Sequence, residues 1–264
     1  MRRSHGIPRI LRPAQKFPAG LQVFVDESIH DRGSFIVVAA VCSKADVQKQ
    51  VVQGLLACGF DPSRDEFKSS MTMRDNPAAR ELRQRLQLIL RHCKIALAVC
   101  PIAERAILAT HLATLLSSVD LPPDTPISAI YLDEGMKRTN TEMPSGAVVT
   151  YGCDSRLVAG IQLADCAAHL AATMLLEELG IVSKTVPAST VYDGQDGEIE
   201  LAWTLWASIR YALSGRTPVG EVDAYGFPEP LMNPFGLVVS DRCSEALKTA
   251  AERRLGTVWI GCIH

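Results

Sequence analysis

The stretch "LQVFVDESIH", residues 21–30, decides the fold, because a run of apolar residues leads directly into an acidic pair. The run predicts a buried β-strand over residues 21–27. A second β-branched apolar run, "GSFIVVAAVC" at 33–42, follows the short polar segment "SIHDRG" and predicts a hairpin with the first strand. Asp26 and Glu27 therefore stand where the first strand is expected to end.

Composition places the chain among ordinary globular proteins. It has 264 residues, 47% hydrophobic and 21% charged, which favours one large domain. A formal net charge of -2 excludes a global attraction to nucleic acid or anionic lipid, so any such contact must be local. Eight cysteines without a CxxC pair or zinc-like spacing favour a reducing cytoplasm.

Strands and helices alternate along the chain, which fits an α/β or α+β domain with a mixed sheet. We take residues 21–214 as one α/β domain in which helices flank the sheet. Residues 1–20 contain three prolines, five Lys or Arg and no acid, and are expected to form a basic arm. Residues 215–264 are expected to form a C-terminal helical extension that packs on the same domain. Further strands are expected at 94–100, 127–135, 146–151 and 189–194. Helices are expected at 44–58, 77–93, 103–119, 155–179, 198–213 and 241–255. Asn76 is expected to cap the helix at 77–93.

A second acidic pair ends a second apolar strand. The segment "AIYLDE" closes with Asp133 and Glu134, as "QVFVDE" closes with Asp26 and Glu27. Neighbouring strand ends in an open sheet meet at one crevice, where ligands usually bind. The alternative is that each pair simply begins a solvated turn.

The apolar segment that starts near Ser155 has a polar stripe. At about 100° per residue, Ser155, Gln162, Asp165 and His169 fall within an arc of about 80°. These polar residues argue against a membrane span for residues 157–176 and favour a buried helix. An ionised Asp on a buried helix is costly unless it is paired or binds a cation; the alternative is that Asp165 bonds neighbouring backbone and Gln162.

Three carboxylates that met at one point would raise one another's pKa unless a cation neutralised them. Asp26, Asp133 and Asp165 offer only oxygen ligands, which favours Mg²⁺ or Mn²⁺. Such a site suits phosphodiester hydrolysis by a two-metal-ion mechanism. In "EFKSS", residues 66–70, Glu66 could complete the metal site and Lys68 could hold a phosphate or the attacking water. A metal-free hydrolase that uses Asp26 and Asp133, such as a glycosidase, stays open.

Four segments taken in order resemble a known family. "VDES", "EFKSS", a second strand that ends in Asp, and "DSRLVAGIQLADCAAHL" are similar to the bacterial domain of unknown function 3800 family over roughly residues 20–180. The resemblance implies an RNase H-like fold with a mixed five-stranded sheet. It also implies an acidic site at Asp26, Glu66, Asp133 and Asp165, with Glu27 beside it.

Two positions depart from the family pattern. Ile29 stands where Gly usually follows the Ser, which predicts an altered turn after the first strand, because Ile tolerates positive φ poorly. Ser69 replaces a smaller Gly or Ala.

The residues and the resemblance together predict a cytoplasmic nuclease that uses Mg²⁺ or Mn²⁺ to cut RNA or DNA. The resemblance also implies an effector of a bacterial antiviral defence or toxin system. The alternative is a non-catalytic RNase H-like binding subunit of a larger complex. The expected catalytic residues are Asp26, Glu27, Glu66, Lys68, Asp133 and Asp165, the metal ligands Asp26, Glu66, Asp133 and Asp165, and the supporting residues Ser28, Gln162 and His169.

Nucleic-acid contacts are expected from basic residues near this site. Arg80, Arg83 and Arg91 share one arc of the helix at 77–93, with a solvated basic face as the alternative. Lys137 and Arg138 follow the second acidic pair directly. Two further partners stay open, a second copy of the chain and a partner protein of a defence system. Trp203 and Trp206 are expected to form a packing face or a dimer surface.

Overall fold

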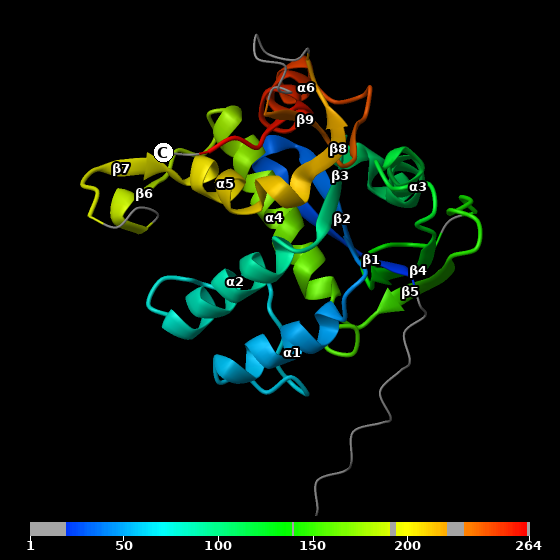
Figure 1. Cartoon of the computed structure of the whole chain (residues 1–264), viewed down its shortest axis with the longest axis horizontal. Coiled ribbons are helices and arrows are strands. Elements are labelled where there is room, and N and C mark those ends of the chain that lie inside the picture. The colour runs from blue at the N-terminus through cyan, green and yellow to red at the C-terminus, as the bar shows by residue number, and fades with distance from the viewer. Residues whose placement is uncertain (1–19, 139, 191–193, 221–229, 263–264) are drawn as a thin grey trace, which may run out of the picture.

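The structure, a computed structural model, describes residues 20–138, 140–190, 194–220 and 230–262. Helices cover both faces of a central mixed sheet, which confirms the expected α/β architecture (Figure 1). The expected N-terminal arm lies outside the described residues except for Gly20.

The central sheet has six strands in the order β10-β3-β2-β1-β4-β5. Its strands are β1 (Leu21–His30), β2 (Phe35–Ser43), β3 (Lys94–Pro101), β4 (Ile127–Asp133), β5 (Val148–Cys153) and β10 (Leu237–Val239). The helices are α1 (Val47–Ala57), α2 (Pro77–Leu90), α3 (Leu108–Ser118), α4 (Ile161–Glu178), α5 (Leu201–Leu213) and α6 (Glu245–Ala251). Two small sheets contain β6 (Thr185–Pro187) with β7 (Glu198–Glu200), and β8 (Ser214–Pro218) with β9 (Leu231–Pro234) and β11 (Val258–Trp259).

Strand β1 is the centre of the sheet and is longer than predicted. It pairs antiparallel with β2 up to His30 opposite Phe35, so it continues past residue 27. Its parallel pairing with β4 ends earlier, at Val25 opposite Leu132. Asp26 and Asp133 are therefore the next residues on the two neighbouring strands once their pairing ends.

The connection from β1 to β2 is a 3₁₀ turn over Asp31–Gly33, followed by Ser34 in the left-handed region at φ 54°. Ile29 lies inside β1, paired with Ile36, so the predicted effect of Ile29 on a turn was wrong. The ladder with β2 keeps the backbone extended at this position.

Each face of the sheet packs its own hydrophobic core. On one face, Phe24 and Ala39 lie in the core that contains α4. On the other face, where α3 lies (Figure 1), Val25 and Val38 belong to a core that contains residues of this helix. Because both faces are covered, the strands read as continuous apolar runs rather than alternating ones.

Helix α4 is buried on almost every side, between the sheet and helices α2, α5 and α6. This position explains its nearly continuous apolar sequence. Among the described residues, no helix combines the length and the apolarity that a bilayer crossing requires.

The predicted cap of α2 is confirmed, because the Asn76 side chain accepts the N–H of Ala79 at 3.0 Å and Pro77 is the first helical residue. Helices α1, α3, α4, α5 and α6 each begin three to six residues later than predicted, and two of the preceding segments have a defined structure. A 3₁₀ helix over Ile102–Ile107 precedes α3, and Ser155 lies in a turn before α4. In that turn the carbonyl of Asp154 accepts two backbone N–H groups, which closes it before the helix starts.

The C-terminal extension contributes strands as well as a helix. β10 pairs in parallel with β3 and adds a sixth strand to the five implied by the family resemblance. Helix α6 begins after Ser244, whose hydroxyl accepts the N–H of Leu247, and continues as a π-helical turn over Glu252–Gly256. In the segment expected as a strand at 189–194, a 3₁₀ turn covers Ala188–Thr190, and residues 191–193 lie outside the described residues.

Gly160, the residue before α4, makes the closest approach between this helix and β1. A Cβ at this position would lie 2.5 Å from ring atoms of Phe24, which is fully buried. We predict that Gly160→Ala lowers the free energy of unfolding by about 1–3 kcal/mol through overpacking, measured by urea denaturation. The control is Gly54→Ala in α1, where the nearest atoms lie at 3.9 Å and Ala should raise stability by about 0.5–1 kcal/mol. Equal stability of the Gly160→Ala variant and the wild type would contradict this packing.

Candidate acidic site

Asp26 marks the point where β1 leaves β4, and its side chain is 7% exposed. Strand alternation directs Asp26 to the same face as Phe24, toward α4, and directs Glu27 to the opposite face. One oxygen of Asp26 accepts the N–H of Glu27 at 2.7 Å. The two adjacent acids therefore serve different faces of the sheet.

The pKa of Asp26 is raised to about 9, first by burial and then by the negative charges of Asp133 and Asp165. Asp133 ends β4 and Asp165 lies in the second turn of α4. Acids from inside β1, from the end of β4 and from helix α4 thus share one electrostatic environment.

Asp165 is buried and is oriented by the segment that contains Glu66 and Lys68. Its Oδ2 accepts the backbone N–H of Ser69 at 2.7 Å. Burial raises the pKa of Asp165, and the Ser69 hydrogen bonds offset part of that rise. Asp165 therefore bonds backbone, as the alternative expected, but this backbone is distant in sequence, and Gln162 bonds Phe67 and Ser155 instead.

Gln162 joins the segment at residues 66–69 to α4 by a hydrogen bond. Its side-chain oxygen accepts the N–H of Phe67 at 2.8 Å, and its side-chain nitrogen donates to the carbonyl of Ser155 at 2.9 Å. The hydroxyl of Ser155 in turn donates to Glu66 Oε2. Glu66 is therefore held at the site through a buried amide that is 1% exposed.

Lys68 supplies the positive charge at this site. Its Nζ lies 3.5 Å from Glu66 Oε2. Burial alone would lower the pKa of Lys68, but the charges of Glu66, Asp133, Asp26 and Asp165 raise it above its usual value. Its ammonium group therefore faces four carboxylates, which we call the acid group: Asp26, Glu66, Asp133 and Asp165.

The acid group fits a hard cation in its chemistry, although its oxygens are more widely spaced than a closed ligand set. No three of them lie within 4.8 Å of one another. Burial and mutual repulsion keep a proton on Asp26, and a divalent cation would relieve that repulsion. The donors are all carboxylate oxygens, which Mg²⁺ and Mn²⁺ prefer.

In the part of the chain that the structure describes, the three ligand atoms that do approach within 4.8 Å belong to Cys100, Glu104 and His111. Glu104 is already satisfied, because His111 Nε2 lies at 2.9 Å and the Ser240 hydroxyl at 2.6 Å from its Oε2. Burial raises the pKa of Cys100 to about 12, so its thiol stays protonated. We interpret this cluster, which sequence analysis missed, as a buried polar network that joins β3 and α3 to the segment after β10.

Glu27 lies behind Asp133, on the α3 side of the sheet. Its Oε2 is buried and has no hydrogen-bond partner among the described residues. Burial raises the pKa of Glu27, Asp133 adds to the rise, and Arg105 opposes it. Gly135 leaves room for this side chain, since a Cβ there would lie 2.6 Å from Glu27 Oε1.

Ser28 and His30 share the α4 face of β1 with Asp26. The hydroxyl of Ser28 lies 2.9 Å from His30 Nε2, and the His30 ring lies 6.2 Å from that of His169. Burial, and then the neighbouring His30, lower the pKa of His169 to about 4, so this ring is neutral. Sequence analysis did not include His30, although strand alternation extended to residue 30 would have placed it with Ser28.

The predicted basic residues do not form one surface. Arg83 is close enough to His169 for its charge to lower the pKa of that ring. Arg91 instead lines a cavity of about 490 Å³ with Lys44, Lys94 and Arg216, by the amino end of β1. Arg83 and Arg91 lie eight residues apart, so the arc on which they were expected passes through two different surroundings along α2.

The other predicted cations are exposed. Arg80 donates to the carbonyl of Met73 at 2.9 Å. Lys137 and Arg138 follow β4 in an exposed loop, and the guanidinium of Arg138 lies 6.0 Å from the ring centre of Tyr151. Lys137 and Arg138 follow Asp133, a member of the acid group, by four and five residues.

No model of a known protein family matches the chain. No curated protein and no solved structure matches it either.

Titration of Asp26 makes stability depend on pH. Its folded pKa of about 9 exceeds the ordinary 3.8, so between these values the folded chain holds a proton that the unfolded chain releases. We predict that, in EDTA, wild-type stability falls as pH rises from 5 to 9, by up to about 1.4 kcal/mol per pH unit from this group. Asp26→Asn should flatten this slope in urea denaturation, whereas Asp124→Asn in an exposed loop should not. Parallel slopes for the wild type and Asp26→Asn would contradict the assignment.

Loss of the Gln162 side-chain amide should make the segment at residues 66–69 less ordered. Gln162→Ala leaves the N–H of Phe67 and the carbonyl of Ser155 without their bonds, at about 1–3 kcal/mol for each unsatisfied group. We predict faster amide hydrogen exchange over residues 66–69 and lower stability, with Gln53→Ala on the exposed face of α1 as the control. Unchanged exchange at Phe67 would show that another contact holds this segment.

Proposed function

We propose that the protein is an RNase H-like nuclease that uses Mg²⁺ or Mn²⁺ to hydrolyse phosphodiester bonds of RNA or DNA. The observation that supports this proposal best is the shared electrostatic environment of Asp26, Asp133 and Asp165, which come from β1, the end of β4 and helix α4. The strands β3-β2-β1-β4-β5 are also consistent with the mixed five-stranded sheet implied by the resemblance to the bacterial domain of unknown function 3800 family.

The residues that would hold the cations are the acid group. Bound Mg²⁺ or Mn²⁺ would lower the pKa of a water molecule and stabilise the leaving oxygen. The chain itself fixes two of these carboxylates before any ligand arrives, Asp165 through the Ser69 N–H and Glu66 through Ser155. Fixed carboxylates reduce the reorganisation that catalysis would otherwise require.

Lys68 is the residue that would receive the scissile phosphate. Its side chain is 45% exposed, so one part faces the acids and another faces solvent. An ammonium in this position attracts the phosphate that the carboxylates alone would repel. Lys137 and Arg138, exposed directly after β4, would then bind the flanking backbone.

Glu27 would act on Asp133 from the opposite face of the sheet rather than touch the substrate. The carboxylates of Glu27 and Asp133 repel each other, and a cation at the acid group would relieve this repulsion. In this proposal Glu27 is a positioning residue.

The proposal is tested by incubating the purified chain with labelled single- and double-stranded RNA and DNA in Mg²⁺, Mn²⁺ or EDTA. We expect cleavage with a divalent ion and none in EDTA. Asp133→Asn should reduce the rate by at least about 100-fold, since even residues that only support a metal ligand contribute 10- to 100-fold.

Asp124→Asn, the same chemical change in an exposed loop, should cleave like the wild type. Cleavage that persists in EDTA would favour a metal-free hydrolase. Binding without cleavage under every condition, by a folded wild-type chain, would favour the non-catalytic binding subunit.

A further inference from the structure

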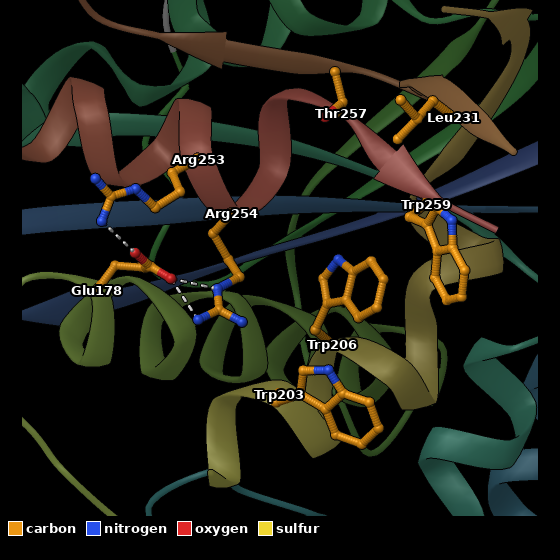
Figure 2. A pocket seen from close by; sticks show the side chains of 8 residues that line it. All are labelled: Glu178, Trp203, Trp206, Leu231, Arg253, Arg254, Thr257 and Trp259. Atoms are coloured by element: carbon orange, nitrogen blue, oxygen red, sulfur yellow. Dashed lines mark hydrogen bonds and ion pairs between the residues drawn. The ribbon is translucent and has the colours of Figure 1, made fainter. Parts of the chain in front are cut away.

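The three tryptophans of the chain converge on one open hollow, away from the acid group (Figure 2). Trp203 and Trp206 come from α5 and Trp259 from β11, and each is only partly buried. The hollow has a volume of about 420 Å³, and Arg253 and Arg254 stand at its edge. Tryptophan is enriched at interfaces, where one side of the ring system is apolar and the other meets water, so three tryptophans at one open site favour a binding surface.

Among the described residues that line the hollow, positive charges outnumber negative ones. Glu178, at the end of α4, pairs with both Arg253 and Arg254, its Oε2 lying 3.6 Å from Arg253 Nη1. One carboxylate cannot neutralise two guanidinium groups, and Arg253 is 70% exposed. A further positive charge lies behind the tryptophans.

That charge is Arg210, which is only 6% exposed. Its guanidinium lies 5.9 Å from the Trp206 ring centre and 5.6 Å from that of Trp259. Its Nε and Nη1 are buried and have no hydrogen-bond partner among the described residues. Two arginines therefore line the hollow and a third lies behind its tryptophans, while Glu178 is the acid among the described residues that line it.

We propose that this hollow binds single-stranded nucleic acid by stacking unpaired bases on the tryptophan rings. Bases stack on aromatic side chains whatever their identity, and arginines attract the phosphates between them. The positive charge argues against a cationic ligand such as methylated lysine, which aromatic cages otherwise take. Bases inside a duplex are already stacked on one another, so the hollow should prefer single strands.

The hollow is separate from the acid group. Asp165 and Glu178 lie 13 residues apart on α4, which corresponds to about 20 Å along the helix axis. The proposal depends on the proposed function only for the choice of nucleic acid as ligand. A strand held here would be retained near the acid group without occupying it.

Intrinsic tryptophan fluorescence reports on this hollow directly, because all three tryptophans of the chain line it. We expect a ten-nucleotide single-stranded RNA or DNA to quench the intrinsic tryptophan fluorescence of the full chain. The titration uses Asp133→Asn in EDTA at low salt, so that neither cleavage nor metal binding contributes. A duplex of the same sequence should bind at least about tenfold more weakly.

Trp203→Leu should weaken binding by roughly 5- to 100-fold, the range that corresponds to one stacked base. Arg253→Gln should weaken binding and reduce its dependence on salt. The matched control is Arg85→Gln, which removes an exposed, glutamate-paired arginine on α2 and should bind like the parent. Thermal unfolding of each variant establishes that it is folded.

Quenching that the variants leave unchanged would overturn the proposal, as would tighter binding of the duplex. So would a fluorescence change that follows protein concentration and ignores oligonucleotide, since that result assigns the hollow to a second copy of the chain. The outcomes are distinguishable from those of the nuclease test. Binding without metal-dependent cleavage by the wild type removes only the proposed function, and cleavage without quenching removes only the stacking site.

Discussion

Repulsion between buried carboxylates is the constraint on which the rest of the site depends. Asp26 and Asp133 are the next residues after the last paired residues of β1 and β4. Helix α4, which packs on the sheet, contributes Asp165 to the same site. Left alone, this arrangement would favour the unfolded chain at neutral pH, where the acids are solvated and apart. The fold tolerates it because Lys68 and the N–H of Ser69 supply positive charge and a hydrogen bond at the same place.

Helix α4 links this electrostatic constraint to the packing of the domain. Gly160 lets its start approach Phe24, and Gln162 and Asp165, one turn apart, then bind the segment at residues 66–69. The backbone of that segment, which has no regular structure of its own, is ordered by two side chains of the helix. A polar stripe on an otherwise apolar helix is therefore explained by hydrogen bonds to a loop as much as by any ligand.

The strands and helices could be predicted from the sequence more fully than the side-chain contacts between distant segments. The apolar runs and the Asn76–Pro77 cap were sufficient to predict β1 to β5 and α2, because hydrophobic periodicity and capping are local signals, whereas β10 was not predicted. The length of β1 was underestimated, since its last residues are held by the ladder with β2 and not by their own propensity. The hydrogen bonds of Gln162 and the different surroundings of Arg83 and Arg91 depend on long-range packing, which no local pattern encodes.

Strand β10 has a consequence for the size of the folding unit. It covers the outer edge of β3 through three paired residues, Leu237 to Val239. A chain cut before this strand would leave the backbone N–H and carbonyl groups of a buried, apolar strand open along that edge. Exposed edges of this kind recruit strands from other molecules, so a shortened chain would be prone to aggregate. The last fifty residues thus protect the sheet from intermolecular pairing, whatever else they do.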